Sequence, residues 1–525
     1  MKTAKKVLML LLSCLLVFPA FAGCAKKASP NAETDIEISF WVSGFGQEYM
    51  DAIVEAFNAK YPQYNAYLDA GRTATTQANT LNLKDKDTVD IYMNQLAAVR
   101  SYIDTADDIT EVLSQKIDGE DKSVAEKYDP QLLTTMTEAD GSVKMISWAG
   151  AMTGIMYNAD IINSSTGFTV PRTSNELRDL CIDLNGENIK PIVHFQDLGL
   201  GYYAYLLKVW QAQYSGLDYY NDTWLQLKGA DGKSPSEEVM LSSTDGRKQA
   251  LEALGMILTP QFVLAGSNSL DFTSAQTNFI QGKAAMMVNG SWIQNEMASS
   301  GAKNLNMRMM RTPVISSIAD KCPSIGDENE ADTELRAVVD SVDAVIDGAA
   351  SPLTGDPEAN VSVGFYNVTE EDWQRVYDAR TLVYHNGNGH VMFINKYSNA
   401  KTAAQKFLQF YFSDEALSLY LEYTHQSPNA NFSRETEVDT SEWTDFEKAQ
   451  YDNSKKLSLL SDSIAQSELF TKTNLHMYGD ISVVNLLSAT NENDRRTAAQ
   501  IWTEFVTSVE KNWDNWLSNA GITVS

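Results

Sequence analysis

Residues 275–292 read AQTNFIQGKAAMMVNGSW, and this stretch decides the fold that we expect. A helix that carries Phe279 is predicted to end at Gly282, because glycine readily adopts the left-handed conformation that closes helices. Residues 283–289 then form a short apolar run, which is typical of a buried strand. The stretch therefore predicts a helix that feeds directly into the core of a sheet.

The chain is expected to turn sharply after this strand. Gly290 makes the turn, Ser291 is the expected N-cap of a new helix, and Trp292 falls in the first turn of that helix. The first N–H groups of a helix have no partner within the helix. The strand therefore ends at an indole that faces a crevice and lies beside free backbone donors.

The beginning of the chain alternates strands and helices. Residues 35–41 alternate apolar and polar side chains, which is the period of a strand. Apolar residues at 50, 53, 54 and 57 mark one face of a helix that ends before Pro62. Residues 64–68 and 90–93 are further strand candidates. This order predicts a parallel α/β sheet.

Ligands of parallel sheets bind beyond the carboxyl ends of the strands. This rule places residues 41–46 at the rim of a candidate site, together with Asn94 and Gln95 after the third strand. A second patch of strand formers at 145–160 contains Trp148 and is broken by glycine. We expect the binding residues to come from several such strand ends.

The stretch at 275–292 resembles extracellular solute-binding proteins of ABC importers, the family that includes maltodextrin-binding protein. Members typically show a phenylalanine, then Gly-Lys-Ala-Ala-Met, a short apolar strand, and a glycine followed by an aromatic residue. Residues 40–57, residues 154–177 and residues 398–415 are also similar to this family. Asn175 departs from it, because the family often has tryptophan there, and residues 324–390 have no clear counterpart.

The resemblance implies an α/β chain of two lobes, a periplasmic-binding-protein-like type II fold with a hinged cleft between the lobes. The expected parts are residues 35–150 as the first part of lobe 1, 151–305 as the first part of lobe 2, 306–395 as a return to lobe 1 with an acidic insertion, and 396–525 as the helical C-terminal part of lobe 2.

The same resemblance implies that the lobes close on a sugar, in size an oligosaccharide, and deliver it unaltered to the transmembrane permease subunits of an ABC importer. No catalysis, cofactor or metal is expected. Flat tryptophan and tyrosine rings suit the C–H faces of sugars, and carboxylate and amide groups suit their hydroxyls. The sequence favours such a ligand because both kinds of side chain follow the expected strand ends.

The candidate ligand-binding residues fall in the segments that are expected to face the cleft. The aromatic candidates are Trp292, Trp41, Phe45, Trp148, Tyr202 and Tyr203, and the polar candidates are Gln47, Glu48, Asn94 and Gln95. Each aromatic residue has packing in a core as its alternative role. Gln47 and Glu48 have a second interpretation as groups that favour a helix start electrostatically.

The first residues read as an export signal. Lysines at positions 2, 5 and 6 precede an apolar run at 7–20, and Phe21-Ala-Gly-Cys24 follows. This end resembles a bacterial lipobox, which implies a signal peptide at 1–23, a lipid on Cys24 and a flexible tether at 24–34. The expected location is the outer face of the bacterial cell membrane. An ordinary secretion signal that happens to contain a cysteine is the alternative.

Composition narrows the partners of the chain. The 525 residues carry a formal net charge of −28, which disfavours nucleic acid and acidic lipid as partners. We expect a monomer.

The cysteines and histidines indicate no metal site or disulfide framework. Cys181 and Cys322 either pair or are separate buried thiols. The five histidines are scattered and form no zinc signature. Residues 324–360 are acidic and rich in glycine and proline, typical of an exposed insertion; a calcium site is the alternative.

Other functions fit parts of the sequence. An exported glycoside hydrolase would need a pair of carboxylates across a cleft, but nothing singles out such a pair among 69 acidic residues. A surface protein that binds or senses glycans would use the same cleft without transport. A receptor for a peptide or another non-sugar solute is also open.

Overall fold

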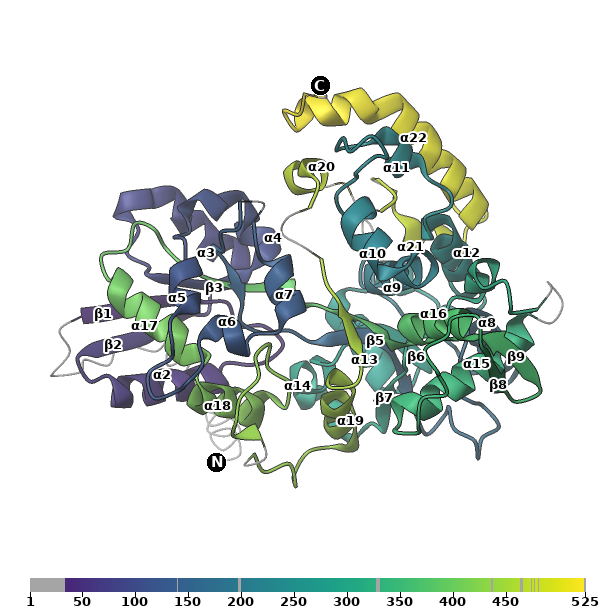
Figure 1. Cartoon of the computed structure of the whole chain (residues 1–525), viewed down its shortest axis with the longest axis horizontal. Helices are drawn as coiled ribbons and strands as arrows, with labels where there is room; N and C mark the ends of the chain where they lie inside the picture. The colour runs from purple at the N-terminus through teal and green to yellow at the C-terminus, as the bar shows by residue number, and fades with distance from the viewer. Residues whose placement is uncertain are drawn as a thin grey trace, which may run out of the picture.

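The computed structural model describes residues 34–138, 140–196, 200–326, 331–435, 438–462, 466–473, 475, 477–479 and 481–523. Two lobes lie side by side, each built around its own sheet, and the C-terminal helix runs along the outside of the second lobe (Figure 1). The expected signal peptide at 1–23, Cys24 and the tether up to residue 33 lie outside the described residues.

The first lobe contains a sheet with the order β2-β1-β3-β11-β4. Its strands are β1 Thr34–Phe40, β2 Tyr64–Ala70, β3 Ile91–Gln95, β4 Ile146–Ser147 and β11 His390–Ile394. β1 is parallel to both β2 and β3, whereas β11 is antiparallel to β3. The helices of this lobe are α2 Glu48–Lys60, α3 Ala74–Thr80, α4 Leu96–Val99, α5 Thr110–Ser114, α6 Val124–Lys127, α7 Pro130–Thr135, α17 Lys401–Tyr411 and α18 Asp414–Thr424, with the 3₁₀ turns η1 Leu81–Lys86 and η2 Arg100–Thr105.

The second lobe contains a sheet with the order β12-β10-β5-β6, and β7 pairs with β5. Its strands are β5 Met152–Asn158, β6 Met286–Gly290, β7 Met307–Met309, β10 Leu382–His385 and β12 Ser458–Leu460, with a separate hairpin of β8 Asn360–Val363 and β9 Tyr366–Thr369. Its helices are α8 Ser174–Gly186, α9 Tyr203–Ser215, α10 Leu217–Tyr219, α11 Glu237–Leu241, α12 Arg247–Ile257, α13 Phe272–Ile280, α14 Ile293–Glu296, α15 Ala331–Ile346, α16 Glu370–Thr381, α19 Asp445–Ser454, α20 Glu468–Lys472, α21 Val483–Ser488 and α22 Ala498–Asn519, and η3 Tyr220–Trp224 is a π-helical turn.

The chain crosses between the lobes from β4 to β5, from β10 to β11 and from α18 to α19. Hydrogen bonds tie these crossings together. The Asn386 amide donates to the carbonyl of Ala151 at 2.9 Å, and the Asn429 side chain donates to the Ser147 hydroxyl at 2.9 Å. The expected two-lobed α/β architecture with crossover segments is therefore confirmed.

The deciding stretch folds largely as predicted. α13 ends before Gly282, whose φ of +71° is the left-handed conformation that glycine allows, and β6 is buried throughout. Ser291 is not the N-cap of the next helix, because Trp292 occupies that position. The Ser291 hydroxyl instead donates to the side-chain carbonyl of Gln426 at 2.5 Å, which draws β6 toward the end of α18.

The expected boundary at residue 396 is wrong. α17 and α18 belong to the first lobe, because the Phe57 ring of α2 lies 5.1 Å from Phe407 and 5.6 Å from Phe410. Tyr49 of α2 likewise lies 5.4 Å from Tyr420 of α18. The helical C-terminal part of the second lobe begins only after this pair of helices, with α19 and β12.

The expected return to the first lobe at residue 306 is also wrong. β7 pairs with β5 in the second sheet, and only at β11 does the chain rejoin the first sheet. The segment between them is not an exposed insertion. Leu335, Val338 and Val342 of α15 are fully buried in the second lobe, as is Trp373 of α16. Residues 327–330 of the acidic run lie outside the described residues.

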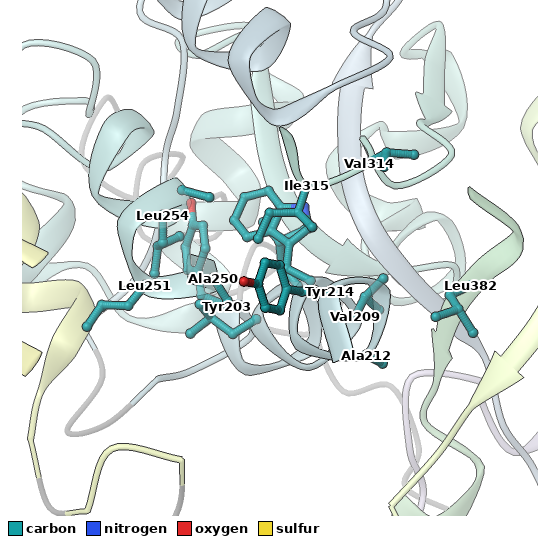
Figure 2. Close-up of a cluster of buried hydrophobic side chains, with 14 of the residues drawn as sticks. Tyr203, Val209, Ala212, Tyr214, Ala250, Leu251, Leu254, Val314, Ile315 and Leu382 are labelled. Carbon is teal, nitrogen blue, oxygen red and sulfur yellow. The ribbon is translucent and has the colours of Figure 1, made fainter. Parts of the chain in front are cut away.

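The core of the second lobe is centred on α9 and α12 (Figure 2). Trp210 of α9 is fully buried, and its indole N–H donates to the carbonyl of Pro313 at 3.0 Å. Cys181 and Cys322 are both buried in this core as separate free thiols. Over the residues that the structure describes, no helix is long and apolar enough to cross a bilayer, and no group of acidic, histidine or cysteine side chains is placed to hold a metal.

Candidate functional site

The aromatic candidates of the first lobe gather beyond β1 and β4. Trp41 stacks on His390 with ring centroids 5.3 Å apart, and Phe45 meets the same imidazole edge-on at 5.3 Å. Trp148 is only 2% exposed and also contacts His390, at 5.3 Å. Burial lowers the pKa of His390 to about 4, so the ring is neutral at pH 7. Trp41 is the half-buried member of this ring cluster, and Trp148 packs inside it.

Trp292 lies at the boundary between the lobes. It follows β6 of the second lobe, yet it packs with the core of the first lobe and is 6% exposed. A Cβ added to Gly44 of the first lobe would lie only 3.1 Å from the indole. A Cβ added to Gly290 would lie 2.1 Å from the same ring, so only glycine fits there. The indole is therefore buried where the two lobes meet, and its contact with a ligand stays a prediction.

A row of tyrosines continues from Trp292 along the second lobe. Tyr202 meets Trp292 edge-on with centroids 5.8 Å apart, and Tyr205 lies 5.3 Å from Tyr202. Tyr205 then stacks on Tyr384 of β10 at 4.7 Å. Tyr203, by contrast, points into the second-lobe core and is 4% exposed (Figure 2). This position favours the packing alternative for Tyr203 over the expected contact with a ligand.

The polar candidates of the first lobe are mostly engaged within it. The Asn94 side chain is fully buried, donates to the carbonyl of Ala74 at 3.1 Å and accepts from the Gln95 amide at 2.6 Å. Gln95 itself is exposed. Glu48 accepts the backbone N–H of Gln47 at 3.1 Å at the start of α2, which favours the helix-start interpretation of this pair.

A cavity of about 540 Å³ opens between the lobes at the far end of the tyrosine row. Arg100 at the start of η2 lines it from the first lobe, and the second lobe supplies the remaining described lining residues. These are Leu200, Gly201, Ala204, Lys208, Tyr220, Trp224, Leu225, Asp462, Gln466, Phe470, Leu475 and Met477. The lining combines aromatic rings with a small number of charged groups, as ligand sites commonly do.

The aromatic wall of this cavity comes from two elements. The π-helical turn η3 carries Tyr220 and Trp224, and such turns often occur at functional sites. Phe470 of α20 lies 5.3 Å from Trp224 and is half-buried, so part of its ring is open to the cavity. The Tyr220 hydroxyl is buried and forms no hydrogen bond within the described part of the chain.

Charged groups meet on the opposite wall. The Lys208 ammonium lies 2.5 Å from the Asp462 carboxylate and 5.1 Å from the centroid of the Tyr384 ring. Asp462 also attracts Arg100: burial lowers the pKa of the Arg100 guanidinium, and the carboxylates of Asp462 and Glu138 oppose this effect. Asp462 of the second lobe and Arg100 of the first lobe therefore hold complementary charges across the cavity.

A buried arginine supports the aromatic wall from behind. The guanidinium carbon of Arg247 lies 4.0 Å from the centroid of the Trp224 ring, and its Nε donates to the Asp245 carboxylate at 2.7 Å. It also donates to the carbonyls of Met240 and Met477. Arg247 and Asp245 have no exposed side-chain surface. This pair fixes two lining residues, Trp224 and Met477, that lie far apart in the sequence.

The structure brings Trp41, Phe45, Trp148, Trp292 and Tyr202 to the boundary between the lobes, but sequence reasoning missed the cavity itself. Two features of the sequence could have indicated the charged residues of this cavity. Lys208 is the only charged residue within α9, and Arg100 follows the same strand end that indicated Asn94 and Gln95. Asp462 carried no local signal, because the pairing of β12 with β10 brings it to the site.

A sequence model of the family described as "Bacterial extracellular solute-binding protein" matches residues 46–417. None of the curated protein sequences compared with the chain matches it. Solved structures, by contrast, match over nearly the whole chain. One is the bacterial solute receptor AcbH, described as having an exclusive preference for β-D-galactopyranose, with 11% identity, a TM-score of 0.58, and coverage of 91% of this chain and 99% of that one.

Two further structures are similar over the same span. A probable secreted solute-binding lipoprotein from Streptomyces coelicolor is 12% identical, with a TM-score of 0.57, and covers 92% of this chain and 99% of its own. The protein RafE in complex with raffinose is 13% identical, with a TM-score of 0.53 and coverage of 90% and 99%. At these identities the likeness establishes the two-lobed type II fold.

Proposed function

This chain belongs to the family of bacterial extracellular solute-binding proteins, and from that premise we propose that it captures a sugar, an oligosaccharide in size, between its lobes. Members of this family are extracellular binding proteins and not enzymes, so the hydrolase alternative falls away. Similar structures are described as binding galactopyranose and raffinose, which supports a carbohydrate ligand.

The observation that carries this proposal is the cavity between the lobes. The half-buried ring of Phe470 offers an apolar surface for the C–H face of a sugar ring, and Asp462, Gln466 and Lys208 offer groups for its hydroxyls. The volume of about 540 Å³ lies within the range of small-molecule sites. Because Arg100 comes from the other lobe, a ligand in this cavity would contact both lobes at once.

Residues at the lobe boundary extend this proposed site. Trp292, Trp41 and Tyr202 form the aromatic surface that leads from the crossings to the cavity, through Tyr205. We propose that opening of the lobes exposes this surface to a longer ligand, because Trp292 contacts both lobes in the present arrangement. Gln95, which is exposed beside the same strand end as Arg100, would meet the ligand's hydroxyls.

A sugar that binds the folded chain is expected to raise its melting temperature. A ligand at a hundred times its dissociation constant adds about 2.7 kcal/mol of stability. Phe470→Ala should weaken that sugar about tenfold, because a ring that stacks on the ligand is lost. Thermal shifts across mono- and oligosaccharides, followed by titration calorimetry of the best ligand, measure both effects.

Phe365→Ala is the matched control for this test, because Phe365 is a phenylalanine that is wholly exposed in the β8–β9 turn, outside the cavity lining. It should leave sugar affinity unchanged. Flat responses to every sugar, with a shift for peptides or amines, would replace the sugar proposal with a receptor for a non-sugar solute.

We also propose that a lipid on Cys24 anchors the protein to the outer face of the cell membrane, where it delivers its ligand as a monomer to the permease subunits of an ABC importer. The Phe21-Ala-Gly-Cys24 sequence supports this, as does the likeness to a probable secreted lipoprotein. Cys24→Ser should abolish incorporation of labelled palmitate and release the protein from the membrane fraction. Unchanged membrane retention of this variant would contradict the anchor.

A further inference from the structure

The cavity between the lobes is richer in cations than the rest of the chain. Its described lining contains Arg100 and Lys208 as cations and Asp462 as the only carboxylate. The whole chain, by contrast, has a formal net charge of −28. An excess of positive charge at this one place is therefore a property of the site and not of the composition.

The single lining carboxylate is shared among several donors. Lys208 lies 2.5 Å from Asp462, the Tyr384 hydroxyl is hydrogen-bonded to Asp462, and Arg100 is attracted to it across the cavity. Glu138 also attracts Arg100, but it does not line the cavity. Asp462 thus interacts with both lining cations and with the Tyr384 hydroxyl.

The cavity contains a further hydrogen-bond donor, the hydroxyl of Tyr220. Tyr220 lines the cavity, is fully buried and carries a hydroxyl that has no hydrogen-bond partner within the described residues. It lies close enough to Asp462 to feel its charge. Buried polar groups are normally paired, so an unpaired hydroxyl in a ligand cavity indicates a group that the ligand itself supplies. The Tyr220 hydroxyl is therefore a donor in the cavity that has no acceptor among the described residues.

We propose that the captured solute carries a carboxylate, as in an oligosaccharide that contains a uronic acid, and that this carboxylate binds between Arg100 and Lys208. This inference rests on the proposed sugar-binding function. The planar guanidinium of arginine matches a carboxylate in a bidentate geometry, and charge-assisted hydrogen bonds are the stronger ones. The half-buried ring of Phe470, which packs against Trp224, then receives the sugar ring.

The same arrangement couples ligand charge to closure of the lobes. Arg100 comes from the first lobe and Lys208 from α9 of the second, so one ligand carboxylate would bridge the two lobes. A neutral sugar of the same shape would offer neither cation a charged partner. The charge of the ligand is therefore the feature by which this site would discriminate.

The test compares digalacturonate with the neutral disaccharide of galactose by titration calorimetry on the full chain. Digalacturonate should bind at least about tenfold more tightly, and its affinity should fall as salt rises. Arg100→Gln and Lys208→Gln should each weaken digalacturonate about tenfold or more, and should weaken it more than they weaken the neutral sugar. Arg100→Lys keeps the positive charge but loses the planar guanidinium that binds a carboxylate with two hydrogen bonds. The affinity of this variant for digalacturonate should therefore lie between those of the unaltered chain and Arg100→Gln.

Lys248→Gln is the matched control, because Lys248 is a lysine of α12 whose side chain is 37% exposed and lies outside the cavity lining. It should leave both affinities unchanged. The comparison of the two sugars on the unaltered chain holds even if a variant fails to fold. Equal or tighter binding of the neutral sugar would overturn this inference and leave the sugar receptor standing. Failure of both sugars to bind would overturn the inference together with the proposed function.

Discussion

Arg247→Met is expected to lower the free energy of unfolding by about 3–5 kcal/mol, because it leaves the Asp245 carboxylate buried without its partner. Arg247 also donates to the carbonyls of Met240 and Met477 and lies over the Trp224 ring. The variant therefore loses an ion pair, backbone hydrogen bonds and the support of the cavity wall at once. Urea unfolding measures the loss.

Lys248→Met is the control for this substitution. Lys248 is the next residue of α12, and its pair with Glu252 is solvent-exposed, so its removal should cost about 0–1 kcal/mol. Adding Asp245→Asn to Arg247→Met should recover part of the stability, because no buried charge is then left. If Arg247→Met lowered the free energy of unfolding by less than about 1 kcal/mol, the Arg247–Asp245 pair would not be what fixes Trp224 and Met477 in the cavity wall.

The loss in the free energy of unfolding that Arg247→Met causes should become smaller as the pH falls. Burial already raises the pKa of Asp245, and the charge of Arg247 opposes that rise. Without Arg247 the folded-state pKa rises further above its unfolded value. A carboxyl group whose pKa is higher in the folded state than in the unfolded state destabilises the fold fully at pH values above the folded-state pKa. This destabilisation declines as the pH falls and is absent below the unfolded-state pKa. Urea unfolding at pH 7 and pH 5 should therefore show the larger deficit at pH 7.

Phe57→Ala is expected to lower the free energy of unfolding by about 3–5 kcal/mol, since Phe57 is fully buried where α2 meets α17. Its ring lies 5.1 Å from Phe407 and 5.6 Å from Phe410. Urea unfolding again provides the measurement. Tyr423→Ala, at a 49% exposed ring of α18, should change stability by less than about 0.5 kcal/mol.

A double-mutant cycle makes this prediction a test of lobe membership. Phe57→Ala and Phe407→Ala should couple by about 0.5–3 kcal/mol, because the two rings touch. If residues 401–411 belonged to the second lobe, the two substitutions would be independent and the coupling would be close to zero.

Local pattern predicted the individual elements well. The helix at α2 and the strands β1, β2 and β3 follow directly from apolar periodicity. The insertion at 324–360 was misjudged because charged residues hide a buried face. Leu335, Val338 and Val342 repeat at helical spacing, and this pattern, rather than the acidity, decided where α15 lies.

The site was harder to predict than the elements. Trp292 was indicated by its position after a strand and a glycine turn, and the structure places it at the lobe boundary. Tyr203 was expected to face the cleft from an aromatic-rich loop, but it lies in the first turn of α9 and points into a core. A helix start alone cannot tell these cases apart, because the direction of a side chain depends on which helix packs against its own.

By itself the sequence determined the local helices and strands, because helix ends and strand periods are encoded by neighbouring residues. The resemblance of the run from Gly282 to Trp292 to extracellular solute-binding proteins also indicated the class of the protein. Only the tertiary structure decided which segments share a lobe and which charges meet. Arg100, Lys208 and Asp462 are brought together by sheet pairing and lobe packing, and contacts over such distances along the chain leave no local pattern.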